Sequence, residues 1–214
     1  MFKVPKVIRQ AIFHHKSGTC AFCLLPATER TVPICAQCKT ELPWTTGPGE
    51  TVGELSAFYY ESPISEYILA GKTGKQLDKL KILADLLAEN LTPRIQKPPQ
   101  AIIPIPLHHA RLRSRGFNQA IELVRPLAHQ LNIPLLNHAI ARNRDTREQK
   151  TLRAVQRAAN MQYAFTINQT IPYQHVALFD DVLTTGATCK TLRDQLLLNG
   201  IKTVEIWCCA TTKQ

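Results

Sequence analysis

Two adjacent carboxylates, Asp180 and Asp181, follow a short apolar run in the stretch "HVALFDDVLTTGAT". Such a run is typical of a buried strand in a parallel sheet, and this places both acids at the carboxyl end of that strand. The residues that follow are small and rich in threonine around Gly186, and we expect a helix to begin near Ala187. Unpaired N–H groups at a helix N-terminus, with threonine hydroxyls beside them, can bind a phosphate.

The two carboxylates would repel that phosphate, so they require a different partner. Carboxylate oxygens only accept hydrogen bonds, which suits the vicinal hydroxyls of a sugar. A metal such as magnesium that bridges hydroxyls and phosphate is an alternative partner. The ligand inferred from this pattern is a pentose phosphate. Its predicted contacts are Asp180, Asp181, Val182, Leu183, Thr184, Thr185, Gly186, Ala187 and Thr188. Two alternatives stay open: a pair of solvated aspartates before a turn, and a phosphoacceptor or metal-binding pair.

Four cysteines near the N-terminus have the spacing of a metal site. Cys20, Cys23, Cys35 and Cys38 form the pattern C-x2-C-x11-C-x2-C. Each pair can present two sulfurs in a tight turn, and two such turns complete a closed tetrahedral site for structural zinc. Disulfides are the alternative, but the chain shows no secretion signal that would favour them. A closed four-sulfur site predicts a structural role, because no coordination position is left for catalysis.

A basic segment, "IIPIPLHHARLRSRGFNQA", contains Arg111, Arg113 and Arg115 between an expected strand and an expected helix. Arginines in such a strand-to-helix loop could bind pyrophosphate or the backbone of a nucleic acid. A solvated basic loop is the alternative. The three arginines should lie at the same sheet edge as the acid pair, because carboxyl ends of parallel strands share one edge.

The whole chain is basic, with 26 Lys and Arg residues against 16 Asp and Glu residues and a net charge of +10. This charge favours a polyanionic partner: nucleic acid, a phosphorylated ligand or an acidic membrane surface. A basic protein without such a partner is the alternative. The sequence contains neither an apolar run of 18 residues nor an apolar signal region, so we expect no transmembrane segment and a cytoplasmic location.

The chain is expected to divide into a zinc-binding finger region at residues 1–50 and an α/β domain at residues 51–214. From residue 100 onward, apolar strands alternate with helices, which predicts a mostly parallel sheet flanked by helices. The expected strands are 101–106, 133–136, 175–180 and 203–211. The expected helices are 62–72, 75–90, 118–132, 147–161 and 187–200.

The acid pair and its threonine loop resemble the signature of type I phosphoribosyltransferases. In that family the two acids contact the ribose hydroxyls of phosphoribosyl pyrophosphate, and the loop binds its 5′-phosphate. The order of the four-cysteine finger, "GKTGK", "RGFNQA" and "LFDDVLTTGATCKT" resembles the ComF-type competence proteins, a phosphoribosyltransferase-like group. This resemblance covers nearly the whole chain and implies a type I phosphoribosyltransferase-like fold with a small zinc-ribbon-like finger.

The resemblance implies roles for further residues. Asp180 and Asp181 would be the catalytic pair of any transferase. Pyrophosphate would be bound by Lys72, Gly74 and Arg115. The net charge, the arginine segment and the basic segment 142–157, rather than the resemblance, favour DNA binding. The expected DNA-binding residues are Lys75, Arg111, Arg113, Arg115, Arg142, Arg144, Arg147, Lys150, Arg153 and Arg157.

Members of the ComF-type group are associated with DNA uptake during natural transformation. The main hypothesis is therefore a protein that handles incoming single-stranded DNA and binds phosphoribosyl pyrophosphate or a related ribose phosphate. Its finger could contact DNA or a helicase or channel protein of the uptake machinery. An active phosphoribosyltransferase with an unknown acceptor is the alternative, and an interaction scaffold with a decayed pocket is a third.

Overall fold

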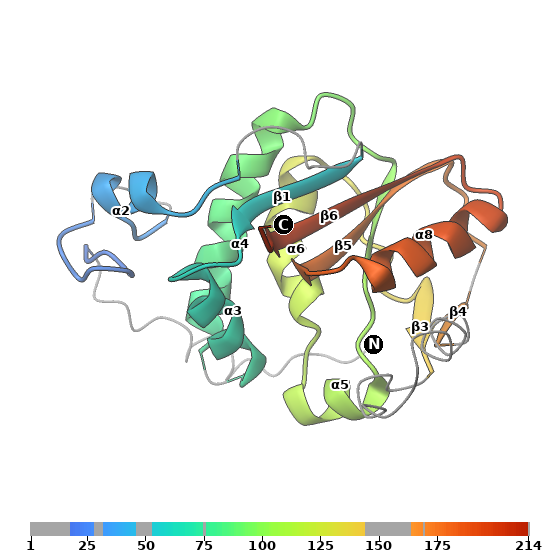
Figure 1. Ribbon diagram of the computed structural model, residues 1–214, viewed down its shortest axis with the longest axis horizontal. Coiled ribbons are helices and arrows are strands. Elements are labelled where there is room, and N and C mark those ends of the chain that lie inside the picture. Colours follow the sequence, from blue (N-terminus) through green and yellow to red (C-terminus); the bar gives the residue numbers. More distant parts are fainter. Residues whose placement is uncertain are drawn as a thin grey trace.

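The computed structural model describes residues 18–27, 32–45, 53–74, 76–143, 164–168 and 170–213. Its centre is a four-stranded sheet with the order β1–β6–β5–β2, in which every neighbouring pair is parallel (Figure 1). The strands are β1 (Glu54–Tyr59), β2 (Ala101–Pro104), β5 (His175–Leu183) and β6 (Thr203–Thr211). This arrangement confirms the expected parallel sheet.

Helices cover both faces of the sheet. One face packs against α3 (Ile64–Lys72), α4 (Leu77–Leu91) and α6 (Gln119–Gln130), and the other against α8 (Ala187–Leu198). Strand side chains alternate between the faces, so Phe179 and Trp207 join the α4 side while Leu178 and Ile206 join the α8 side. This alternation explains the near-continuous apolar strands, since both faces are buried.

Smaller elements complete the described chain. A short antiparallel ribbon pairs β3 (Ile140–Arg142) with β4 (Phe165–Ile167). The remaining helices are α2 (Ala36–Glu41), the 3-10 turn η1 (Thr92–Arg94) and α5 (His109–Arg115).

Three local expectations were wrong. β1 was not expected, and the arginine segment predicted as a loop forms α5, closed by Gly116 with φ +80°. Residues 133–136 form no strand; they join β2 only through the bridge between Ile102 and Leu135. Pro134 lies in this segment and cannot donate a ladder hydrogen bond, which limits the pairing.

The cysteine-rich finger packs directly on α3 and α4. Buried Cys20, Ile34 and Leu42 belong to the same hydrophobic cluster as the leucines of α4. The ring of Phe22 stacks on Tyr67 of α3 at 4.7 Å between centroids, and the Tyr67 hydroxyl donates a hydrogen bond to the carbonyl of Ala21. The finger and the helical layer therefore share one core.

Candidate ligand cleft and cysteine site

The acid pair lies near the carboxyl end of β5, inside the strand rather than after it. The Asp181 N–H donates to Asp180 Oδ1 at 2.8 Å, and the Val182 N–H donates to Asp181 Oδ1, also at 2.8 Å. Each carboxylate thus accepts a backbone hydrogen bond from the following residue. These bonds fix the orientation of both side chains at the sheet edge.

The electrostatic environments of the two carboxyl groups differ. Burial and the adjacent Asp181 carboxylate raise the pKa of Asp180 to about 8. Asp181 is paired with a cation, since the Lys72 Nζ lies 3.2 Å from its Oδ2. Lys72 stands in the last turn of α3, so this ion pair joins the "GKTG" segment to the acid pair.

The loop after β5 has the geometry expected of an anion site. Gly186 adopts φ +67°, a left-handed conformation that favours glycine, and it is the N-cap of the 12-residue helix α8. Thr184 and Thr188 line the cleft described below. Thr185 instead accepts a hydrogen bond from the Ala187 N–H at 3.4 Å. The loop therefore offers two hydroxyls and the first-turn amides of α8 that follow Ala187.

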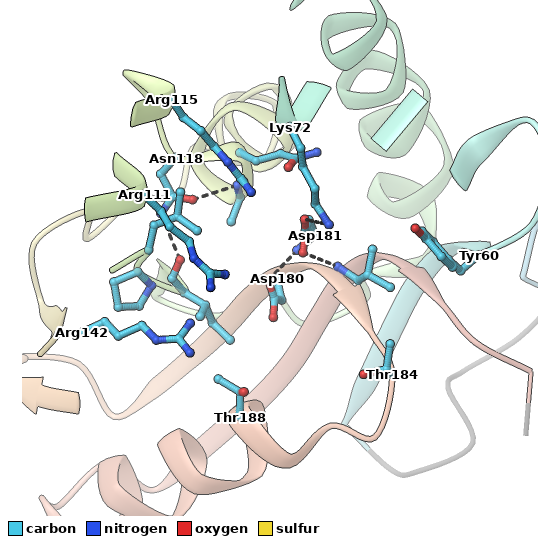
Figure 2. A pocket seen from close by; sticks show the side chains of 16 residues that line it. Tyr60, Lys72, Arg111, Arg115, Asn118, Arg142, Asp180, Asp181, Thr184 and Thr188 are labelled. Atoms are coloured by element: carbon cyan, nitrogen blue, oxygen red, sulfur yellow. Dashed lines mark hydrogen bonds and ion pairs between the residues drawn. The ribbon is translucent and has the colours of Figure 1, made fainter. Parts of the chain in front are cut away.

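A cleft of about 260 Å³ surrounds the acid pair, and Figure 2 shows the side chains that line it. Its cationic lining residues come from three elements: Lys72 from α3, Arg111 and Arg115 from α5, and Arg142 from β3. The sequence predicted Lys72 and Arg115 as pyrophosphate ligands and Arg111, Arg115 and Arg142 as DNA ligands. The structure places all four in one cleft. Its further lining residues are Tyr60, Ile105, Pro106, Leu107, Asn118, Gln119, Ala120 and Val182.

The "RGFNQ" segment builds the wall between α5 and α6. The Asn118 Nδ2 donates to the Ile105 carbonyl at 3.0 Å, while its Oδ1 accepts from the Ala120 N–H and caps α6. Gln119 is 1% exposed and its Nε2 donates to the Ile68 carbonyl of α3 at 2.8 Å. Its Oε1 is buried and has no hydrogen-bond partner within the described structure.

This wall approaches the "GKTG" segment closely. A Cβ on Gly71 would lie 3.3 Å from Gln119 Nε2, and one on Gly74 would lie 3.6 Å from the Arg115 carbonyl oxygen. No role in the site was predicted from the sequence for Tyr60, Asn118 or Gln119. The adjacency of Asn118 and Gln119 to the basic run was the available signal.

The four finger cysteines form a second candidate site. Their sulfur atoms all lie within 4.8 Å of one another, and Cys23 Sγ is 3.6 Å from Cys35 Sγ. A tetrahedral zinc ion with Zn–S bonds of about 2.3 Å separates its sulfurs by about 3.8 Å, so the cluster fits a metal. Burial opposes ionisation of Cys20, but backbone hydrogen bonds from Cys23, Cys35 and Phe22 lower the pKa of its thiol to about 6.

Of the other expected DNA-binding residues, the described part of the chain includes Arg113. Arg113 lies on α5 but is exposed and is not among the described lining residues. Six expected DNA-binding residues lie outside the described residues: Lys75, Arg144, Arg147, Lys150, Arg153 and Arg157.

The strand order, together with an acid pair and a threonine-glycine turn at the carboxyl end of β5, defines an α/β protein with a candidate ligand site at one edge of its parallel sheet. Competence protein F of Haemophilus influenzae is 33% identical to the chain over 207 residues, which cover 90% of each protein. The chain therefore belongs to the competence protein F family, and this confirms the resemblance to ComF-type proteins.

Other similar proteins cover most of the chain at comparable identity. DNA utilization protein YhgH of Salmonella typhimurium is 32% identical over 211 residues, covering 97% of this chain and 88% of that protein. YhgH of Escherichia coli K12 is 32% identical over 199 residues, covering 90% and 84%. No protein-family model matches the chain. Within the described residues, no helix has the length and apolar character needed to cross a membrane.

Similar solved structures are distant in sequence. A hypoxanthine phosphoribosyltransferase of Trypanosoma cruzi aligns with a TM-score of 0.37 and 16% identity, covering 67% of this chain and 64% of that one. The Staphylococcus aureus enzyme aligns with a TM-score of 0.36 and 16% identity, covering 60% and 61%.

Proposed function

We propose that this protein handles incoming single-stranded DNA in the cytoplasm during natural transformation, and that its cleft binds phosphoribosyl pyrophosphate or a related ribose phosphate. The observation that carries the proposal is the shared cleft, where four cationic side chains and two threonines surround the acid pair. The names of the curated relatives, which refer to competence and DNA utilization, support the DNA role.

The cleft chemistry divides the ligand into three parts. Asp180 and Asp181 would accept hydrogen bonds from the ribose hydroxyls. Thr184, Thr188 and the N-terminal amides of α8 would bind the 5′-phosphate. The pyrophosphate would then meet the cations beside the acid pair: Lys72, Arg111, Arg115 and Arg142. A magnesium ion bound with the ligand would neutralise part of its charge.

A thermal-stability measurement tests the ligand part of the proposal. Phosphoribosyl pyrophosphate at about 100 times its dissociation constant should stabilise the protein by about 2.7 kcal/mol. The Asp180→Ala/Asp181→Ala variant should fold and lose this stabilisation, because both side chains line the cleft. An undiminished stabilisation in that variant would place the ligand elsewhere.

An active phosphoribosyltransferase is the second candidate. It is favoured by the combination of sugar-binding acids and cations in one cleft, since such cations could stabilise departing pyrophosphate. Release of pyrophosphate should be measured with a panel of nucleobases and with single-stranded DNA as acceptors. Turnover with any acceptor would move this function to first place.

We also propose that the finger binds one structural zinc ion through Cys20, Cys23, Cys35 and Cys38, whose clustered sulfurs support the assignment. The finger region, residues 1–50, would then form a metal-stabilised unit docked on the domain at residues 51–214. It could contact DNA or a helicase or channel protein of the uptake machinery.

A further inference from the structure

The cleft contains most of the described arginines that the sequence assigned to DNA. Arg111 and Arg115 are four residues apart on α5, so they project from the same helix face, and both line the cleft. Arg113 lies between them in sequence and is exposed. The basic run is therefore divided into a cleft-facing pair and an outward-facing residue.

The third cleft arginine comes from a different element. Arg142 belongs to β3, and its guanidinium carbon lies 5.4 Å from the centroid of the Phe165 ring on β4. This stacking orients the long side chain. In Figure 2 its guanidinium points into the same space as that of Arg111, beside Asp180. A phosphate chain that binds these arginines would thus enter the space beside the acid pair.

Two polyanions would compete for the same groups in this cleft. Its volume of about 260 Å³ is below the roughly 300–1,000 Å³ of typical ligand pockets. Pyrophosphate and the backbone of a strand would also require the same guanidinium groups, and their negative charges would repel each other.

We infer that single-stranded DNA and the phosphorylated ribose occupy this cleft one at a time, so that binding of phosphoribosyl pyrophosphate releases the strand. This inference rests on the proposed function. The shared chemistry is a sugar with phosphate groups on either side of it. A free ribose phosphate and a strand present this chemistry to the same arginines, and they differ at the sugar hydroxyls.

The acid pair should distinguish the two ligands. Free ribose offers two vicinal hydroxyls to Asp180 and Asp181, whereas a nucleotide inside a DNA strand offers none. The acid pair therefore favours the small ligand, and the Asp181 carboxylate repels the phosphates of the strand. Asp181 also forms an ion pair with Lys72 at 3.2 Å. Replacing Asp181 by a neutral residue would therefore make the Lys72 ammonium group available to bind DNA.

The test is a competition titration with the intact protein. Binding of a fluorescent single-stranded oligonucleotide is measured in magnesium buffer at increasing phosphoribosyl pyrophosphate, with sodium chloride added to keep the ionic strength constant. Competition at one site predicts that the apparent dissociation constant for DNA rises linearly, by about elevenfold when the ligand is at ten times its own dissociation constant. Ribose 5-phosphate should act in the same way at higher concentrations, because it lacks the pyrophosphate.

Three variants sharpen the test. Arg111→Gln/Arg115→Gln should weaken both DNA and ligand at least tenfold. The matched control, Arg113→Gln, removes a charge from the same helix, but the ligand should still displace DNA from it. Asp180→Asn/Asp181→Asn should bind DNA more tightly than the wild type and should resist displacement. Each variant is first checked for folding by circular dichroism.

The outcomes separate the inference from the function on which it rests. If the wild type binds neither DNA nor ligand, the proposed function fails. If it binds both but DNA affinity does not change with ligand, the two sites are separate and the inference is overturned. A DNA affinity that falls and then levels off would also overturn it, since exclusive binding gives no plateau.

Discussion

Asp180 is a half-buried acid in the cleft, and its environment destabilises the ionised carboxylate. Its pKa is raised to about 8, so the folded protein binds a proton more tightly there than the unfolded chain, whose Asp has an ordinary pKa of 3.8. Stability should therefore fall as pH rises from about 4 to about 8. The ligand in turn supplies hydroxyl groups that can hydrogen-bond to the carboxylate.

Asp180→Asn should remove this penalty. The variant should be more stable than the wild type by roughly 1 to 3 kcal/mol at pH 8, and the difference should shrink toward zero near pH 4. Urea unfolding at both pH values measures it. Asp181→Asn is the control, and it should stabilise less because it removes the ion-pair partner of Lys72. A difference that does not change with pH would contradict the raised pKa.

Gln119 offers a second prediction at the residue scale. Its buried Oε1 has no partner within the described structure, while its Nε2 binds the Ile68 carbonyl. Gln119→Met keeps the volume, removes one unpaired acceptor and loses one hydrogen bond, so its stability should stay within about 1 kcal/mol of the wild type. The stabilisation by phosphoribosyl pyrophosphate should fall, because α3, which carries Lys72, loses its hydrogen bond from Gln119. An unchanged ligand response would limit Gln119 to a structural role.

At the scale of elements, the finger and the α3–α4 layer should lose stability together. Cys20, Ile34 and Leu42 share a buried cluster with α4, and Tyr67 joins α3 to the finger. Elemental analysis should give one zinc per chain. Chelation of the metal should then lower the melting temperature of the whole protein in one transition. A second transition at the original temperature would show that the finger unfolds independently.

The elements that the sequence predicted well have strong local patterns. β5 and β6 are long apolar runs, and α4 repeats leucine at helical spacing, with Leu80, Leu83 and Leu87 fully or almost fully buried. The elements that it missed depend on tertiary partners. β1 is a short, partly polar segment whose pairing with β6 defines it. α5 has no apolar face to reveal it, although the glycine stop at Gly116 was visible.

The candidate site also combines residues that a local sequence pattern predicts with residues that only the tertiary structure brings together. The acid pair and threonine loop are contiguous in sequence, so their role was predictable from one segment. Arg111 and Arg115 both face the cleft only because α5 is a helix, and Arg142 reaches the cleft because it lies on the β3–β4 ribbon. Tyr60 enters from the end of β1, an element that the sequence did not reveal.

At the scale of the whole molecule, the charge of +10 should make DNA binding depend strongly on salt. For single strands, the logarithm of affinity falls by roughly 0.7 per phosphate neutralised for each unit of log salt. An interface of three to five cationic side chains therefore predicts a slope between about −2 and −3.5.

The shape of the cleft limits which form of DNA can reach its positive charges. Its arginines lie inside a confined space, which a single strand can enter more readily than a rigid duplex, so single strands should bind more tightly. Neutralising Arg111 and Arg115 in the cleft together with the exposed Arg113 of the same helix should flatten the salt slope by about 2, if each of the three contacts one phosphate. Fluorescence anisotropy at four or more salt concentrations measures the slope for each form of DNA. If the triple variant loses ligand binding but keeps the wild-type DNA affinity and slope, these arginines serve only the ligand, and DNA binding must depend on other parts of the basic surface.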